Sequence, residues 1–296
     1  MKFMKTLIEK IDRHQMDEQV LARAGEILKS GGLVAFPTET VYGLGANALD
    51  ENAAMKTYAA KGRPSDNPLI VHITDVEDLP IVARNISDKA KQIMERFWPG
   101  PLTLIFEKQY IVPFGTTGGL HTVAVRMPTD EIARAVIRAG GGYISAPSAN
   151  TSGRPSPTSA QHVADDFDGR IDMILDGGEA DIGLESTIID LTVNPPQILR
   201  PGFVTEGMLA EVLGTVDVDR TILDNSSGLA PKAPGMKYRH YAPSGELTIV
   251  MGELKTVIGY INEQTGKYQE KGYKVGVIGS HEALKQYRAD VVKDIG

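Results

Sequence analysis

The chain has 296 residues, 42% of them apolar and 23% charged, which is typical of a folded, water-soluble protein with room for two domains. Its formal net charge of −7 opposes non-specific binding to nucleic acid or anionic membranes. The absence of cysteine excludes disulfides, thiolate metal sites and a cysteine nucleophile, and it fits a reducing compartment; we expect a cytoplasmic protein.

Short apolar runs alternate with helical patterns and loops through the first two thirds of the chain. The N-terminus is charged, and no apolar run approaches the roughly 18 residues of a spanning helix, so we expect neither a signal peptide nor a membrane span. A helix is predicted over 17–29. Strands are predicted at 33–36, 69–73, 101–106, 121–127, 143–146, 172–175, 187–191 and 197–200. This pattern predicts a mixed α/β domain.

One loop, KGRPSDNPLIVHI at 61–73, has an unusual composition. Asp50 is a credible N-cap of the helix before it, and Gly62 is a credible left-handed C-cap. Lys61 and Arg63 then stand among proline and glycine ahead of an apolar strand, which indicates an anion site. Each cation taken alone is equally well explained as solvated, and Lys61 is also favoured by the helix dipole.

Two strand residues are further candidates. His72 shares a strand face with Ile70, although a lone strand histidine is more often structural than functional. Arg126 shares a face with Thr122, and this pair fits a carboxylate clamp as well as it fits an ordinary surface pair. The loop SAPSANTSGRPSPT at 145–158 has the hydroxyls, amide and glycine of a phosphate-binding turn, although taken alone it is better explained as a Ser/Pro-rich connector.

The composition changes after residue 205. Residues 206–243 are polar and rich in Gly and Pro, and we expect an interdomain linker there. A strand at 246–251, a helix at 254–272, a strand at 273–280 and a helix at 281–289 then begin an α/β pattern. We therefore expect three parts: a catalytic domain at 1–205, the linker, and a partial α/β domain at 244–296.

Several nucleotide and hydrolase motifs are missing. The chain has no G-x-x-x-x-G-K-[ST] loop, and GLGANA lacks the last glycine of a dinucleotide fingerprint. It has no G-x-S-x-G elbow and no H-E-x-x-H helix. Any nucleotide-binding site in this chain must therefore be built from a different motif.

Seven segments taken in order resemble the YrdC-like family, whose members are threonylcarbamoyl-AMP synthases. They are PTETVYGLGA (37–46), KGRPSDNPLIVHI (61–73), FWPGPLTLIF (97–106), VAVRMP (123–128), SAPSANTSGRPSPT (145–158), ESTIIDL (185–191) and LRPG (199–202). The linker and the α/β pattern after it resemble the long, two-domain form. The resemblance implies a twisted, largely mixed or antiparallel sheet flanked by helices with a concave basic site, followed by a partial Rossmann-like domain.

The resemblance also implies an activity. ATP, L-threonine and bicarbonate would form threonylcarbamoyl-AMP and pyrophosphate, with Mg²⁺ held mainly by the nucleotide phosphates rather than by a protein metal site. The product would pass to the tRNA threonylcarbamoyl transfer machinery, which modifies the adenosine next to the anticodon, and contact with tRNA is compatible with this role. No membrane partner is implied.

The resemblance assigns site residues by position. The threonine-binding positions are Thr40, His72, Arg126 and Ser186. The ATP-contacting positions are Arg63, Asn67, Thr122, Ala146, Ser148, Ser156 and Arg200. Lys61, Arg63 and Arg200 would supply catalysis by neutralising charge on the phosphates. In the linker, either His240 or Tyr241 should approach the nucleotide as the segment folds over the site; the sequence leaves that choice open.

Two other functions compete with this one. A module that binds double-stranded RNA or tRNA without adenylylation would use the same concave basic surface, but the net charge of −7 argues against it. The carbamoyl-adenylate chemistry of hydrogenase-maturation domains is the other alternative. Those domains occur in much larger chains with zinc-finger cysteines, and this chain has no cysteine.

Overall fold

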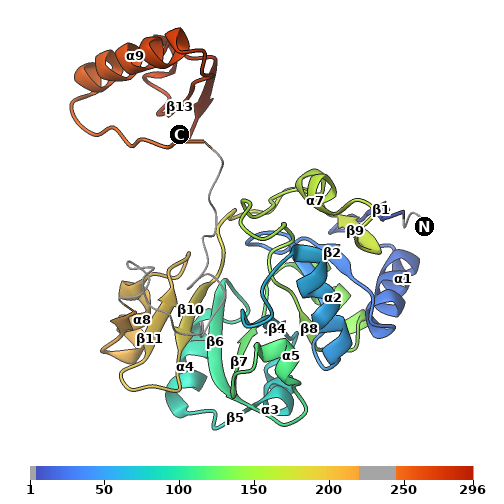
Figure 1. Cartoon of the computed structure of the whole chain (residues 1–296). Coiled ribbons are helices and arrows are strands. Elements are labelled where there is room, and N and C mark those ends of the chain that lie inside the picture. The colour runs from blue at the N-terminus through green and yellow to red at the C-terminus, as the bar shows by residue number, and fades with distance from the viewer. Residues whose placement is uncertain (1–4, 220–244, 296) are drawn as a thin grey trace. The chain divides into compact units, whose positions relative to one another are not determined.

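The structure, a computed structural model, describes residues 5–219 and 245–295 (Figure 1). The chain divides into two compact units, residues 1–242 and residues 243–296. Each unit is described by itself. Within the described ranges, no helix has the length and apolar character needed to cross a membrane.

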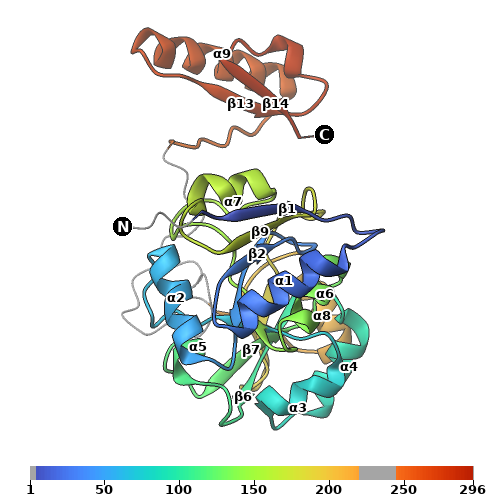
Figure 2. The same cartoon turned by 90° about the vertical axis from the view of Figure 1, so that its right-hand side faces the viewer.

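The first unit is built on one sheet of twelve strands. In chain order these are β1 (Leu7–Lys10), β2 (Val34–Phe36), β3 (Gly43–Asn47), β4 (Ile70–His72), β5 (Ala83–Arg84), β6 (Leu102–Lys108), β7 (Thr122–Arg126), β8 (Ile144–Ser145), β9 (Met173–Asp176), β10 (Thr187–Asp190), β11 (Gln197–Arg200) and β12 (Asp217–Val218). The spatial order is β1-β9-β2-β3-β8-β4-β7-β6-β10-β11-β12, with β5 beside β6. Figure 2 shows β1, β9 and β2 side by side.

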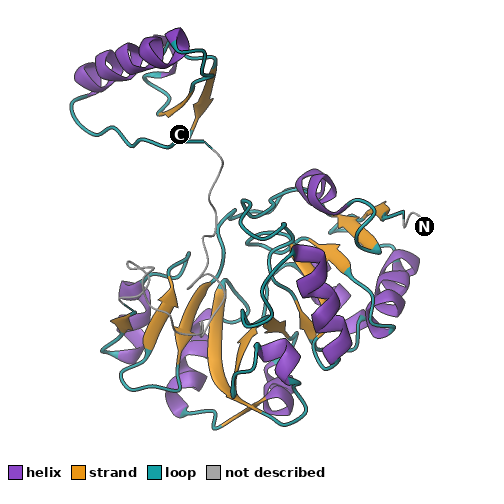
Figure 3. Ribbon diagram, viewed as in Figure 1, coloured by secondary structure: helices purple, strands orange, loops and turns teal. Residues whose placement is uncertain are grey.

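Helices flank this sheet (Figure 3). They are α1 (Glu18–Lys29), α2 (Glu51–Lys61), α3 (Leu79–Val82), α4 (Asp88–Phe97), α5 (Phe114–Thr117), α6 (Glu131–Ala139), α7 (Ala160–Phe167) and α8 (Glu206–Leu213), with a 3-10 turn at Val76–Asp78. β4 pairs with β7 in parallel, whereas β6 pairs with β7 antiparallel. The predicted mixed α/β fold with a helix-flanked sheet is therefore confirmed.

The two faces of the central strands are covered differently. On one face, Val71, Leu104 and Val125 belong to a large core that also includes residues of α3, α4 and α8. The opposite face has a small apolar cluster made of strand residues alone: Ile70, Ile105, Ala124, Ile188 and Leu199. Side chains alternate between the two faces of a strand. Polar residues that stand two positions from these apolar residues therefore lie on the same, open face.

The caps predicted around α2 are confirmed. The Asp50 carboxylate accepts from the backbone N–H of Asn52, and Gly62 ends the helix with φ of 60°, a left-handed conformation that costs glycine little. At α7, the spacing of Thr158 and Gln161 resembles a capping box, but Ser159 caps the helix: its side chain accepts from His162 N–H.

The glycines of the 37–46 segment serve close packing. A Cβ on Gly45 would lie 2.6 Å from Phe36 Cε1 and 3.0 Å from the Val34 carbonyl oxygen. β3 can therefore lie this close to β2 only without a side chain at this position. The turn between these strands, residues 37–42, is buried throughout, unlike most loops.

The segment expected to begin the linker belongs to the first unit in part. Residues 206–219 form α8, which packs on α4, and β12, which pairs in parallel with β11. The following residues, 220–244, lie outside the described ranges. They include nearly all the rest of the expected linker, with His240 and Tyr241.

The second unit is smaller. α9 (Leu254–Glu270) accompanies two parallel strands, β13 (Gly276–Gly279) and β14 (Val291–Asp294). The expected strand at 246–251 is wrong: Leu247, Ile249 and Met251 alternate as in a strand, but they are 76–88% exposed and no strand pairs with them. The expected helix at 281–289 is reduced to a 3-10 turn at Leu284–Gln286.

Candidate active site

The candidate site begins with three neighbouring side chains on the open face of the sheet. Arg126 is the register partner of His72 on β4 and of Thr103 on β6. Directly paired residues point to the same face, so these three side chains form a short polar row across three strands. The row lies at the edge of the small apolar cluster that contains Ile70 and Ala124.

Arg126 is 5% exposed and is held from two sides. Its Nη1 donates to Thr40 Oγ1 at 2.9 Å, and its Nε donates to the Gly100 carbonyl at 3.4 Å. Its Nη2 lies 2.8 Å from Glu39 Oε1, but the angle is not that of a hydrogen bond, and Nη2 has no hydrogen-bond acceptor. Among the described residues, this buried guanidinium thus has one nitrogen, Nη2, that is ion-paired with Glu39 but makes no hydrogen bond.

His72 is 2% exposed and neutral at physiological pH. Burial, followed by the charge of Arg126, lowers the pKa of His72 to about 3. Its Nδ1 lies 3.1 Å from the Ile70 carbonyl, which can only accept, so Nδ1 carries the ring proton. In the neutral ring Nε2 is then a hydrogen-bond acceptor.

Ser186 and Arg200 continue the polar row on the neighbouring strands. Ser186 Oγ and Thr103 Oγ1 lie 2.7 Å apart, and Arg200 Nη2 donates to Ser186 Oγ at 3.1 Å and to its carbonyl at 3.0 Å. Gly202 allows this approach, since a Cβ there would lie 2.5 Å from the Glu185 carbonyl oxygen. The glycine of LRPG thus explains how Arg200 reaches Ser186.

Lys61 is 1% exposed and ties two loops together. Its Nζ donates to the carbonyls of Ser148 and Asn150, both at 2.5 Å, and its own carbonyl accepts from Ser152 N–H. Burial, followed by the Arg63 charge, lowers the pKa of Lys61. Its ammonium is directed at backbone oxygens of the 145–158 loop, so it supports that loop.

Arg63 and Asn67 shape the loop after α2. Arg63 Nη2 donates to Asn67 Oδ1 at 2.6 Å and to the Pro68 carbonyl at 3.0 Å, and Nε donates to the Asn67 carbonyl at 3.2 Å. Asn67 Nδ2 is buried and has no hydrogen-bond partner within the part of the chain that the structure describes. Because an unpaired buried amide is costly, this N–H₂ group is a candidate donor to a ligand.

The remaining predicted nucleotide positions lie on or near the 145–158 loop, except Thr122. Ser148 Oγ donates to Asn150 Oδ1 at 2.6 Å, and Ser156 Oγ donates to the Glu185 carboxylate. Thr122 begins β7, four residues before Arg126, and at about 3.3 Å per residue it lies roughly 13 Å further along the strand.

One carbonyl joins the two groups of predicted residues. The Ile70 oxygen accepts from Ala146 N–H at 3.0 Å and from His72 Nδ1 at 3.1 Å. Ala146 is a predicted nucleotide contact and His72 a predicted threonine contact. The structure therefore brings residues from both sets to the same place on β4.

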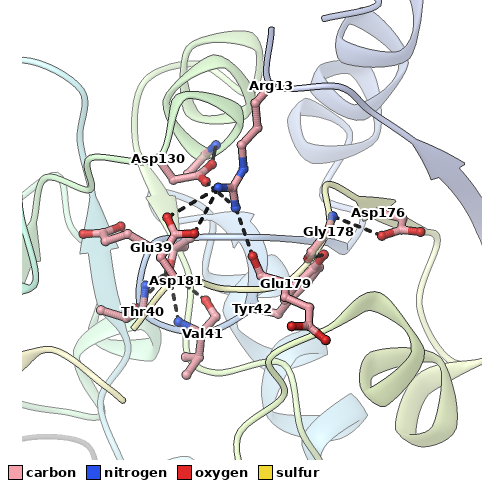
Figure 4. Close-up of polar contacts among 12 residues, drawn as sticks. Arg13, Glu39, Thr40, Val41, Tyr42, Asp130, Asp176, Gly178, Glu179 and Asp181 are labelled. Atoms are coloured by element: carbon pink, nitrogen blue, oxygen red, sulfur yellow. Dashed lines mark hydrogen bonds and ion pairs between the residues drawn. The ribbon is translucent and has the colours of Figure 1, made fainter. Parts of the chain in front are cut away.

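Sequence reasoning missed Glu39, although it lies inside the quoted segment PTETVYGLGA. It is 5% exposed, and neither carboxylate oxygen accepts a hydrogen bond. Figure 4 shows it near Thr40, Asp130 and Arg13. The only signal in the sequence was an acid between two threonines directly after a buried strand, and a turn there is normally exposed.

The loop at residues 179–183, which is distant in the sequence, packs against this turn. Gly183 N–H donates to the Thr40 carbonyl and Ile182 N–H to the Glu39 carbonyl, both at 2.9 Å. Arg13 donates to the Glu179 carbonyl and pairs with Asp181. These contacts, several of them visible in Figure 4, fix the backbone that presents Glu39 and Thr40.

The arrangement suits a ligand that carries both charges of an amino acid together with phosphates. The strand-borne row offers a guanidinium, hydroxyls and a neutral imidazole acceptor. The loops offer amide and hydroxyl groups beside Arg63. These are the groups expected of an amino-acid adenylylating site, in which positioning and charge neutralisation do most of the catalytic work.

Comparison with known proteins agrees with this class. The family model Sua5_yciO_yrdC, described as "Telomere recombination", matches residues 26–202, and the model described as "Threonylcarbamoyl-AMP synthase, C-terminal domain" matches residues 204–295. A Pyrococcus abyssi protein named "Threonylcarbamoyl-AMP synthase" is 52% identical over 96% of this chain and 82% of its own length. A Bacillus subtilis protein of the same name is 46% identical over 100% of this chain and 84% of its own length.

Solved structures agree as well. "Crystal structure of P. abyssi Sua5 complexed with L-threonine" is 51% identical, with a TM-score of 0.92 over 98% of this chain and 84% of that one. E. coli YciO, at 24% identity and a TM-score of 0.62 over 67% of this chain and 96% of its own, shares the fold. The chain belongs to the two-domain Sua5/YrdC family of threonylcarbamoyl-AMP synthases.

Proposed function

We propose that this chain is an enzyme that joins ATP, L-threonine and bicarbonate into threonylcarbamoyl-AMP and pyrophosphate. Its activity as a threonylcarbamoyl-AMP synthase, a nucleotidyltransferase, rests on relatives that carry this name at 46–52% identity. Bicarbonate as the carbon source, Mg²⁺ and the residue roles are the proposed parts. The observation that supports the residue roles is Arg126, a buried guanidinium beside the neutral His72, whose Nη2 is ion-paired with Glu39 and, among the described residues, makes no hydrogen bond.

In the threonine half of the site, Arg126 is proposed to hold the substrate carboxylate. A carboxylate is the natural acceptor for a guanidinium with a free donor. The threonine hydroxyl can donate to Nε2 of the neutral His72, and Ser186 and Thr40 supply further hydroxyl contacts. A site that hydrogen-bonds a substrate hydroxyl rejects an analogue without it, since its own polar groups are then left unpaired.

In the nucleotide half, Asn67 and Arg63 are proposed to contact ATP. The unpartnered Nδ2 of Asn67 supplies a donor, and Arg63 holds the loop backbone at three points. Arg200 reaches the junction of the two halves through Ser186. Lys61 acts by fixing the carbonyls of Ser148 and Asn150, so its part in catalysis is to position the loop.

The chemistry then needs two bond-forming steps. The threonine ammonium first releases a proton; the resulting amine attacks the carbon of bicarbonate, which loses water to give the carbamate. A carbamate oxygen attacks the α-phosphorus of ATP, and pyrophosphate leaves. Both reacting groups are anionic at the second step, so cations at the junction lower the barrier by offsetting their repulsion.

Mg²⁺ is proposed to arrive with the ATP phosphates. Mg²⁺ is often bound by phosphate oxygens and waters with one or two carboxylates. Among the described residues, no group of three or more His, Asp or Glu side chains is arranged to hold a metal. The residues that hold the phosphates would thus hold the ion indirectly, and no step above depends on its position.

The wider setting is also a proposal. The product would be handed to the tRNA threonylcarbamoyl transfer machinery, and the lack of cysteine supports a reducing compartment such as the cytoplasm. His240 or Tyr241 would approach the nucleotide from the segment after residue 219.

A substrate-omission assay tests the function. ATP, L-threonine, bicarbonate and Mg²⁺ together should release pyrophosphate, and leaving out threonine or bicarbonate should abolish the release. Unchanged release without threonine would refute the assignment. Steeply salt-dependent RNA binding with no pyrophosphate release would favour the RNA-binding alternative instead.

A further inference from the structure

Glu39 is a buried acid whose hydrogen-bonding capacity is unused. It is 5% exposed, and among residues 5–219 and 245–295 neither Oε1 nor Oε2 finds a hydrogen-bond donor. Its one close partner is Arg126, whose Nη2 lies 2.8 Å from Oε1 and also makes no hydrogen bond. Carboxylates taken out of water normally recover their solvation through hydrogen bonds, so this pair is left incompletely satisfied.

The neighbouring charges do not complete it. Asp130 is a second buried acid close by, and it has its own partners: it accepts from Ala133 N–H at 2.8 Å and pairs with Arg13 at 3.3 Å. Figure 4 shows Glu39 in the same group of residues as Asp130, Arg13 and Asp181. A pair serving stability alone would be expected to aim its N–H groups at the carboxylate.

An amino acid supplies what both members lack. Its carboxylate and its ammonium stand on one carbon atom, so a receptor for it needs an anion site and a cation site side by side. The spare donor of Arg126 and the spare acceptors of Glu39 meet at 2.8 Å, on residues fixed by Thr40 and by the closing loop at 182–183.

We propose that Glu39 receives the α-ammonium group of L-threonine while Arg126 receives its carboxylate. Glu39 is then a specificity residue that selects α-amino acids over carboxylates without the amino group. The inference rests on the proposed function, because it takes threonine as the ligand of this half of the site. The resemblance to the family assigned no role to Glu39, so this contact with threonine is an addition to the site.

Binding of two matched ligands tests the proposal without ATP. (3R)-3-Hydroxybutanoate is L-threonine with the amino group replaced by hydrogen. The full chain should bind L-threonine at least about 10-fold more tightly, as expected for a charge-assisted hydrogen bond. Calorimetry measures the tighter ligand, and competition measures the weaker one.

Substitution of Glu39 should remove this preference. Glu39→Gln should weaken L-threonine binding by about 10- to 100-fold and change 3-hydroxybutanoate binding by less than about threefold. Glu39→Asp, which keeps the charge, should fall between the two. Glu179→Gln makes the same substitution at an exposed acid in the same region and should leave both affinities unchanged.

Two results would overturn the proposal. Equal weakening of both ligands by Glu39→Gln would mean that Glu39 only holds Arg126. A wild-type chain that binds both ligands equally would refute it even if the Gln variant failed to fold. Because these are binding measurements, they are separate from the pyrophosphate assay: release by the wild-type chain with no ligand preference would remove this inference and keep the function.

Discussion

The two halves of the site are held in place by different means. Arg126, His72 and Thr103 stand on paired strands, so their spacing is set by the sheet register, and the core behind those strands resists displacement. Lys61, Arg63 and Asn67 stand at a helix end and on a loop, where side chains bound to backbone carbonyls set the geometry. Threonine, the smaller substrate, is thus proposed to bind in the half that the sheet holds in place.

This difference implies that the halves should fail separately. Loss of a strand residue should affect threonine and leave the loops folded, whereas loss of a loop cation should affect ATP and leave the strands intact. The two halves share one contact: the Ile70 carbonyl accepts from both Ala146 N–H and His72 Nδ1. A change at this carbonyl should therefore affect both halves. Four experiments examine how far the separation holds.

The largest effect is expected for Arg126→Met. It removes the carboxylate donor and leaves Glu39 as a buried, unpaired charge, so threonine binding should weaken at least ~100-fold and the free energy of unfolding should fall by about 3–5 kcal/mol. ATP affinity should change by less than about threefold. Calorimetry and urea denaturation measure these quantities.

The matched control is the double variant Arg126→Met with Glu39→Gln. Removing both charges should restore much of the stability but not threonine binding, since the penalty arises from the unpaired partner. A double variant as unstable as the single one would show that the loss comes from packing.

The next effect is expected for Arg63→Ala. The loop loses three hydrogen bonds, and ATP binding should weaken by about 10- to 100-fold while threonine binding without ATP changes less than about threefold. Arg84→Ala removes an exposed arginine that pairs with the exposed Glu107 and should not affect either ligand. Equal losses for both ligands with Arg63→Ala would contradict the separation.

A smaller effect is expected for Lys61→Met. The carbonyls of Ser148 and Asn150 lose their donor, which should cost about 1–3 kcal/mol of stability after the relief from burying a charge. Hydrogen exchange should speed up at residues 149–152 and stay unchanged in β7. Faster exchange in β7 as well would show that the halves share one folding unit.

The smallest effect is expected from pH. The pKa of His72 is about 3 in the folded chain and about 6.5 when unfolded, so the unfolded state takes up the proton first as pH falls. The free energy of unfolding should therefore decrease as the pH falls below 6.5. His72 alone should account for a decrease of about 1.4 kcal/mol at pH 5.5. His72→Gln should flatten the decline in a melting series, and His162→Gln, at an exposed site, should not.

Local sequence signals predicted the parts of the fold that depend on neighbouring residues. The caps at Asp50 and Gly62 are local, and the strands around His72 and Arg126 follow from apolar alternation. The strand expected at 246–251 failed because alternation is necessary but a strand also needs a backbone partner. Gly and Pro content after residue 205 did not reveal that residues 206–213 form α8 and pack on α4, because composition carries no information about tertiary contacts.

The candidate site was predictable only as a set of residue types. Motif position named His72 and Arg126, and their register pairing across β4 and β7 required the structure. Lys61 was expected at the phosphates, but its direction toward two carbonyls depends on where a loop 87 residues away comes to lie. Glu39 escaped notice because nothing local shows that its turn is buried.

The pairing of β1 with β9 determines when the chain can complete its fold. Thr6 bonds the carbonyl of Phe167, 161 residues away, and β1 lies parallel to β9 at the end of the sheet. At about 5–20 residues per second, a ribosome needs roughly 10–30 seconds to make the partner after the first strand appears. The edge strand β1, with its exposed Leu7 and Ile8, therefore has no strand partner during that interval, when it is most open to pairing with another chain.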